Sequence, residues 1–202
     1  LKSKNAFPFG WGLEDNAFFD GTLQYIQQLR RQQKPWMLTL LTVGTHQPYG
    51  VPESYNKRFD DKKMASVAYA DYAVTEFLKT LKSRGVLNDT LVIVMSDESH
   101  GADLRLASAW GVNMMFAPDK NLPALKTGSY GHVDLATSIL DYFDLPVAGV
   151  MGRSQFRDYD TGRSLFSYTN GLLRYLAPDN QFYECQFQSG CRVNAQAGFI
   201  RP

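Results

Sequence analysis

The stretch Thr90-Leu91-Val92-Ile93-Val94-Met95-Ser96-Asp97 decides the fold class of this chain. Most of it is an unbroken apolar run, which is typical of a short strand buried on both faces of a sheet. Asp97 follows directly at the carboxyl end of that predicted strand. Because ligands of layered α/β proteins bind beyond the carboxyl ends of the strands, Asp97 is a candidate functional residue.

The segments on either side of this strand predict an α/β protein. Two further apolar runs, residues 36–43 and 112–117, are expected to form strands. Apolar residues at helical spacing predict helices over residues 15–33, 63–84 and 132–142. Asp15 is the expected cap of the first helix. The third helix is expected to bury Ala136, Ile139, Leu140 and Phe143. Helices and strands that follow one another in this way indicate a layered α/β sheet.

The chain changes character after Pro146. Short aromatic segments alternate with turns and predict a small antiparallel sheet, with strands over residues 164–169, 172–176, 181–187 and 192–199. Cys185 and Cys191 lie here in a polar sequence, which favours a disulfide over the alternative of two free thiols. A disulfide would imply an oxidising compartment. We therefore expect two domains, residues 1–160 and residues 161–202.

The composition limits what the chain binds through bulk charge. The 202 residues include 21 Lys and Arg against 20 Asp and Glu, so the net charge is +1. This balance argues against a nucleic-acid partner, which would require a strong positive field. No apolar run reaches the roughly 20 residues that a membrane-spanning helix needs.

Polar residues at the predicted strand ends carry the possible chemistry. Asp97-Glu98-Ser99-His100 combines carboxylates with an imidazole, which suits a divalent cation but also an ordinary polar turn. His46 is either a proton carrier at a ligand or a loop histidine that bonds a neighbouring carbonyl. His132 opens the third helix, whose N-terminus is either an anion site or an ordinary capped end.

Four segments in order resemble the sulfatase-like branch of the alkaline phosphatase superfamily, especially its bacterial phosphoglycerol transferase and lipoteichoic acid synthase group. They are Trp11-Gly12-Leu13-Glu14-Asp15, then Thr42-Val43-Gly44-Thr45-His46-Gln47-Pro48-Tyr49, then Tyr69-Ala70-Asp71 with Leu78, Leu81, Asn88-Asp89-Thr90 and Val92-Ile93 followed by Ser96-Asp97, and last His132-Val133-Asp134-Leu135-Ala136-Thr137-Ser138-Ile139-Leu140. The likeness covers about residues 11–145. It implies a three-layer α/β/α sheet of the alkaline-phosphatase and sulfatase type, with the small antiparallel segment at its C-terminal end.

The resemblance also implies roles for single residues. Asp97 matches the metal-binding aspartate of the family, and His46 matches the histidine that contacts the transferred group or substrate. His132 matches a position near the active site, so it is a second candidate catalytic residue, and Trp11 is expected to contact substrate.

One departure from the family pattern concerns the metal. Glu98 stands where the family has a histidine after the aspartate, so either Glu98 or His100 is expected as the second ligand. Oxygen ligands would favour manganese or magnesium over zinc.

The function that the resemblance implies is metal-dependent transfer or hydrolysis of phosphodiesters, moving phosphoglycerol or phosphoethanolamine. The expected partners are an anionic phospholipid or phosphodiester donor, an envelope glycan or lipid acceptor, and the upstream half of the same protein, where the family has its nucleophile. The intact protein is expected in the bacterial inner membrane, with this domain facing the periplasm or the cell exterior. An alternative is a catalytically degenerate module that binds an envelope glycan or headgroup. A flavodoxin-like domain is a third reading, although its glycine-rich first turn has no counterpart here.

Overall fold

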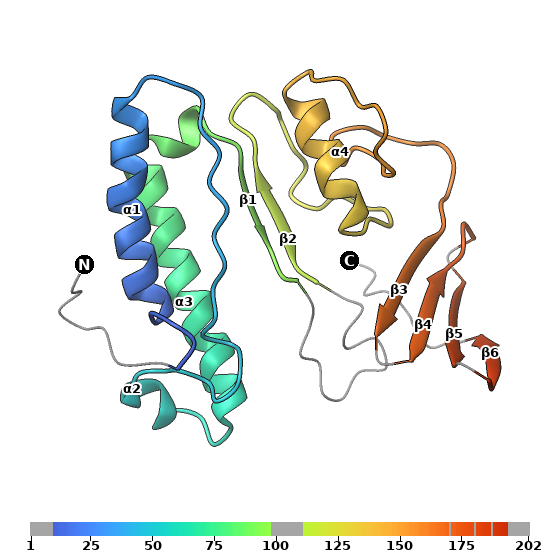
Figure 1. Cartoon of the computed structure of the whole chain (residues 1–202), viewed down its shortest axis with the longest axis horizontal. Helices are drawn as coiled ribbons and strands as arrows, with labels where there is room; N and C mark the ends of the chain where they lie inside the picture. Colours follow the sequence, from blue (N-terminus) through green and yellow to red (C-terminus); the bar gives the residue numbers. More distant parts are fainter. Residues whose placement is uncertain (1–9, 98–110, 170, 180, 187, 194–202) are drawn as a thin grey trace. The chain divides into compact units, whose positions relative to one another are not determined.

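The computed structural model describes residues 10–97, 111–169, 171–179, 181–186 and 188–193 (Figure 1). The chain divides into two compact units, with the boundary between Thr90 and Leu91. The expected domain boundary near residue 160 stays a prediction.

The first unit is built on two long helices, α1 (Asp15–Arg31) and α3 (Lys62–Ser83). They lie side by side and run in the same direction, so their C-terminal ends are at the same end of the unit (Figure 1). The stacked rings of Phe19 and Phe77, with centroids 4.4 Å apart, join them. A short helix α2 (Glu53–Asn56) and a 3-10 turn η1 (Val86–Asn88) complete the unit. The predicted helices are confirmed to within two residues.

The cap of α1 differs from the prediction. The Glu14 carboxylate, and not that of Asp15, accepts hydrogen bonds from the backbone N–H groups of Asn16 and Ala17, at 2.9 and 2.7 Å. Asp15 already belongs to the first helical turn, and its carboxylate reaches a distant loop. Glu14 has the extended backbone of an N-cap residue (φ −62°, ψ 154°), whereas Asp15 is already helical, so Glu14 takes the capping role.

The predicted strand over residues 36–43 does not form a strand in this structure. The side chains of Met37 and Leu41 are 79% and 75% exposed, whereas a central strand would bury both faces. A strand requires backbone hydrogen bonds to a neighbouring strand. Among the described residues, no strand pairs with residues 36–43. The apolar run therefore remains an unpaired segment here.

The second unit contains two separate sheets and one helix. Strands β1 (Val92–Met95) and β2 (Asn113–Phe116) pair antiparallel, and α4 (Val133–Tyr142) follows. The second sheet has the order β3-β4-β5-β6 and is antiparallel throughout. Its strands are β3 (Leu165–Thr169), β4 (Leu172–Leu176), β5 (Phe182–Gln186) and β6 (Gly190–Val193). The antiparallel C-terminal sheet is thus confirmed, although residues 194–199 of its last expected strand lie outside the described residues.

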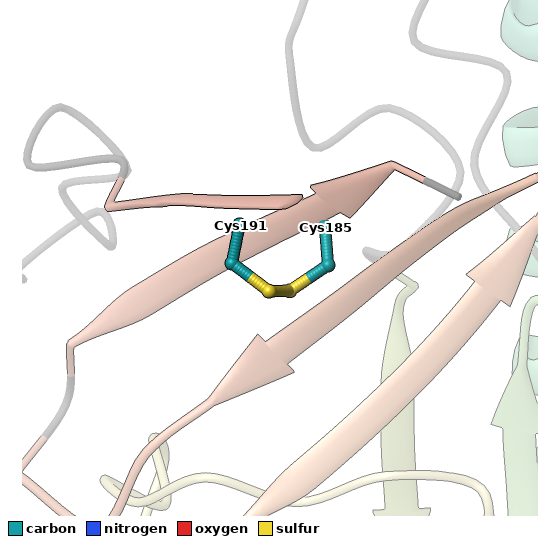
Figure 2. Close-up of a disulfide and its surroundings, with 2 residues drawn as sticks. All are labelled: Cys185 and Cys191. Carbon is teal, nitrogen blue, oxygen red and sulfur yellow. A yellow bond between two sulfur atoms is a disulfide. The ribbon is translucent and has the colours of Figure 1, made fainter. Parts of the chain in front are cut away.

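A disulfide closes the end of this sheet. Cys185 and Cys191 are directly opposite each other on β5 and β6 and are joined by an S–S bond of 2.03 Å (Figure 2). The predicted pairing is confirmed, and the alternative of free thiols is wrong.

The buried face of α4 is polar, contrary to the expectation. The buried residues of the helix are Asp134, Thr137, Ser138 and Tyr142. Of the four residues expected to be buried, Ala136 and Phe143 are exposed, and Ile139 and Leu140 are only partly buried. Ser138 Oγ accepts the backbone N–H of Gln155 at 2.9 Å and donates to the carbonyl of Asp134 at 2.7 Å. These bonds hold the following loop against the polar face, so hydrogen bonding decides the orientation of the helix.

Candidate functional site

The first group of candidate residues is a cluster around the carbonyl oxygen of Gln47. The indole N–H of Trp11 donates to this oxygen at 2.8 Å. The His46 imidazole lies against the indole, with ring centroids 4.4 Å apart, and its Nδ1 is 2.8 Å from the same oxygen. The structure therefore brings two predicted site residues, Trp11 and His46, together.

The contact with Gln47 determines which nitrogen of His46 is available. A carbonyl oxygen only accepts hydrogen bonds, so Nδ1 carries the proton. In the neutral ring Nε2 then holds the lone pair, and it forms no hydrogen bond with any residue that the structure describes. The structure thus shows His46 bonded to a neighbouring carbonyl, which was one of the two alternatives for this residue. The other alternative stays open, because this bond leaves Nε2 able to accept or deliver a proton at a ligand.

The loop that carries His46 is attached to the start of α1 through Asp15. A carboxylate oxygen of the buried Asp15 accepts the backbone N–H of Gly44 at 3.2 Å. Burial raises the pKa of Asp15 above its ordinary value, against the lowering effect of the backbone donors of Gly44 and Val43. A Cβ on Gly44 would lie only 2.6 Å from an Asp15 carboxylate oxygen, so this approach needs a glycine.

A second buried carboxylate fixes the same region to α3. The hydroxyl of Tyr69 donates to Glu14, the residue that caps α1. Both side chains are almost completely buried. Burial, followed by the bond to Glu14, raises the pKa of Tyr69, so the phenol stays protonated and remains a donor. Glu14, Asp15, Gly44 and Tyr69 were not among the predicted site residues. All four nevertheless stand in the segments that carry the family resemblance, which is the sequence signal for them.

The second group of candidate residues lies where β1 ends. Two hydrogen bonds hold Ser96 to Val112, just before β2. The backbone N–H of Ser96 donates to the carbonyl oxygen of Val112 at 3.0 Å, and the backbone N–H of Val112 donates to Oγ of Ser96 at 2.9 Å. Nε2 of His132 lies 2.9 Å from the carbonyl oxygen of Ser96 and must be the donor. His132 is therefore a positioning residue for the backbone that leads into Asp97, and its Nδ1 holds the lone pair.

His132 is the N-cap residue of α4, and its side chain forms no capping hydrogen bond. The buried Asp134 carboxylate accepts the backbone N–H groups of Gly131 and Arg153, at 2.8 and 2.7 Å, and is paired with the Arg163 guanidinium. These donors and this cation pair the Asp134 carboxylate in the first turn of α4, and the choice between an anion site and an ordinary capped end at this terminus stays a prediction.

The predicted metal ligands are only partly within the described structure. Asp97 is exposed at the end of β1, where a carboxylate has room for a cation. Glu98 and His100 lie outside the described residues. Within the described residues, no group of three His, Cys, Asp or Glu side chains is arranged to hold a metal ion. Asp97 alone thus fits one position of a ligand set, and the other positions stay predictions.

Comparison with known proteins assigns the family. The profile of the Sulfatase family matches residues 2–145, which is more than two thirds of the chain. The chain therefore belongs to the sulfatase family. This membership confirms the predicted fold class, because sulfatase domains have the α/β fold of alkaline phosphatase.

Curated relatives resemble a shorter part of the chain. A lipoteichoic acid synthase-like protein of Bacillus subtilis is 26% identical over 95 residues, which cover 43% of this chain and 15% of that protein. A phosphoglycerol transferase I of Xanthomonas campestris is 27% identical over 94 residues, covering 43% and 13%. The corresponding protein of Salmonella paratyphi B is 29% identical over 94 residues, covering 43% and 12%. The matched region is thus less than one sixth of the length of these relatives.

None of the helices in the described part of the chain has both the length and the apolar character to cross a membrane.

Proposed function

We propose that this chain is part of a metal-dependent enzyme that transfers or hydrolyses phosphodiesters. In the proposed reaction, phosphoglycerol or phosphoethanolamine moves from an anionic phospholipid to an envelope glycan or lipid. The observation that carries the proposal is the His46 cluster, in a chain that belongs to the sulfatase family. The names of the relatives support phosphoglycerol as the transferred group.

His46 and Trp11 are proposed to act on the transferred group. Because Nδ1 of His46 is fixed on the Gln47 carbonyl, Nε2 binds a phosphate oxygen or protonates the leaving oxygen. Trp11 is exposed, so part of its indole face is open to the organic part of the substrate.

The cation is proposed to be held by Asp97 with Glu98 or His100, and oxygen ligands make manganese or magnesium preferable to zinc. When bound, it would supply positive charge to the phosphate and lower the pKa of an attacking oxygen. His132 supports this position through the Ser96 carbonyl. The nucleophile is proposed to belong to the upstream half of the same protein.

The proposed location is a bacterial inner membrane, with this domain facing the periplasm or the cell exterior. The Cys185–Cys191 disulfide supports an outward-facing domain, because disulfides persist in oxidising compartments.

The test measures bound metal and turnover of bis(4-nitrophenyl) phosphate on the intact protein. Asp97→Ala is expected to lose both the metal and the activity. His46→Ala is expected to keep the metal and to lose turnover by roughly 100-fold or more, the usual contribution of a general acid or base. Asp20→Ala, which removes an exposed carboxylate of α1, is the matched control and should change neither quantity.

Two results would contradict the proposal. If Asp97→Ala retains metal and turnover, the assignment of the metal site is wrong. If the unmodified protein binds soluble headgroup phosphodiesters but turns over no ester, the degenerate binding module replaces the enzyme as the better account.

A further inference from the structure

The shared C-terminal end of α1 and α3 contains a pocket that the candidate site does not use. Its volume is about 300 Å³. Its walls combine three buried apolar side chains with glutamine and arginine, and the residues are Leu23, Ile26, Gln27, Arg30, Arg31, Arg84 and Val86. Its α1 residues lie in the C-terminal half of the helix, from Leu23 to Arg31, which at 1.5 Å per residue is about 12 to 24 Å from Asp15 along the helix axis. The pocket is therefore separate from the His46 loop that Asp15 holds.

The charges around this pocket are not balanced. Arg30 is neutralised by Asp89, through two hydrogen bonds of 2.6 and 2.9 Å. The exposed side chains of Arg31 and Arg84 have no acidic or hydrogen-bonding partner among the residues that the structure describes. Lys34 follows the end of α1 by three residues, and Lys82 lies in the last turn of α3. Both are also exposed and have no partner among the described residues.

The negative ends of the two helix dipoles offset only part of this positive charge. Each helix C-terminus carries a partial charge of roughly −0.5, so the two parallel helices together supply about −1. Arg31, Lys34, Lys82 and Arg84 supply four positive charges, although the whole chain has a net charge of only +1. An excess of roughly three positive charges therefore remains at this end of the unit.

The combination of walls and charges selects the ligand class. Guanidinium groups form paired hydrogen bonds with phosphate oxygens, so Arg31 and Arg84 suit a phosphate group. The small exposed part of Leu23, Ile26 and Val86 forms an apolar wall that suits the carbon atoms next to a lipid phosphate, which inorganic phosphate does not have. The volume is at the lower limit for small-molecule sites, so it accommodates a headgroup and not a whole lipid.

We propose that this pocket binds the phosphate headgroup of an anionic phospholipid and so attaches the first unit to a membrane surface. The attachment is separate from the proposed turnover, because no residue of the His46 cluster or of the Asp97 region lines the pocket.

The main experiment measures binding of the intact protein to phosphatidylcholine vesicles with and without phosphatidylglycerol. For an anchored protein, it is done in detergent with mixed micelles of the same two lipids. Arg31→Gln combined with Arg84→Gln is expected to weaken binding to phosphatidylglycerol about 25-fold, at roughly fivefold for each basic residue. The control, Lys57→Gln combined with Lys62→Gln, removes the same charge from exposed positions away from the pocket and should bind as the unmodified protein. Equal weakening in both double variants would overturn the proposal.

A second variant distinguishes a built pocket from diffuse attraction. Gln27 is exposed, so Gln27→Trp fills the opening without changing the charge or the core. It is expected to lose most of the phosphatidylglycerol binding, with an unchanged circular dichroism spectrum. Unchanged binding by Gln27→Trp would show that charge alone attracts the protein and would overturn the pocket. Soluble glycerol 3-phosphate that binds as tightly as the lipid would also overturn it, because the apolar wall would then contribute nothing.

Discussion

At the scale of single residues, two adjacent carboxylates have different roles. Glu14 caps α1 and accepts the Tyr69 hydroxyl, whereas Asp15 accepts the N–H of Gly44 in the loop that carries His46. Burial raises the pKa of Asp15 more than its backbone donors lower it. Both buried carboxylates have a structural role at the start of α1. Glu14 joins it to α3, and Asp15 joins it to the loop that carries His46.

Gly44→Ala tests this connection. The added Cβ would lie 2.6 Å from the Asp15 carboxylate, so either the carboxylate or the loop must move. Overpacking of this kind costs about 1–3 kcal/mol, and we expect the free energy of unfolding in urea to fall by that amount. Turnover is expected to fall as well, because the displaced loop carries His46.

Gly10→Ala is the control for this substitution. Nothing lies within 4 Å of a Cβ at Gly10, so its unfolding curve should match that of the unmodified protein. A Gly44→Ala variant with the same stability and turnover as Gly10→Ala would show that the Asp15 contact does not position the loop.

At the scale of elements, strong local periodicity was a reliable guide. The helices α1, α3 and α4 and the strand β1 lie where the apolar spacing predicts them, because each pattern repeats over several turns or forms a continuous run. The prediction for residues 36–43 was wrong for a non-local reason. The same apolar run forms a strand only when another strand is beside it.

The disulfide is a prediction at this scale. It joins residues that are six apart in sequence. Closing such a short loop lowers the conformational entropy of the locally unfolded strands, and this stabilises the folded strand pair by about 2 kcal/mol. In the variant Cys185→Ser with Cys191→Ser, the backbone amides of β5 and β6 are expected to exchange with deuterium roughly 30-fold faster, which is that energy expressed as a ratio.

Amides of α4 serve as the internal reference and should exchange at an unchanged rate. If β5 and β6 exchange as in the unmodified protein, the strand pairing alone holds this end of the sheet.

At the scale of the whole molecule, the exposed apolar segment is the feature to explain. Met37 and Leu41 are largely exposed on an unpaired run of residues that has the composition of a buried strand. The proposed upstream half of the same protein would supply a neighbouring strand. This pairing would bury both side chains and satisfy the backbone of residues 36–43.

Oxidation of methionine tests this pairing in the intact protein. Met37 and Met151 are 79% and 83% exposed in the present structure, so equal reactivity toward hydrogen peroxide follows if nothing covers them. With an upstream strand in place, Met37 should oxidise several-fold more slowly than Met151, as measured by mass spectrometry. Equal rates would contradict the proposed upstream partner for this segment.

The sequence by itself determined the helices, the strand before Asp97, the antiparallel C-terminal sheet and the cysteine pair. These follow from local periodicity, turn residues and short spacing. Only the tertiary structure decided that Trp11 shares the Gln47 carbonyl with His46, that Asp15 holds Gly44, and that α4 buries its polar face. The first two contacts join residues 36 and 29 positions apart. Such hydrogen bonds leave no period in the sequence, and they form because folding brings buried donors and acceptors into reach of one another.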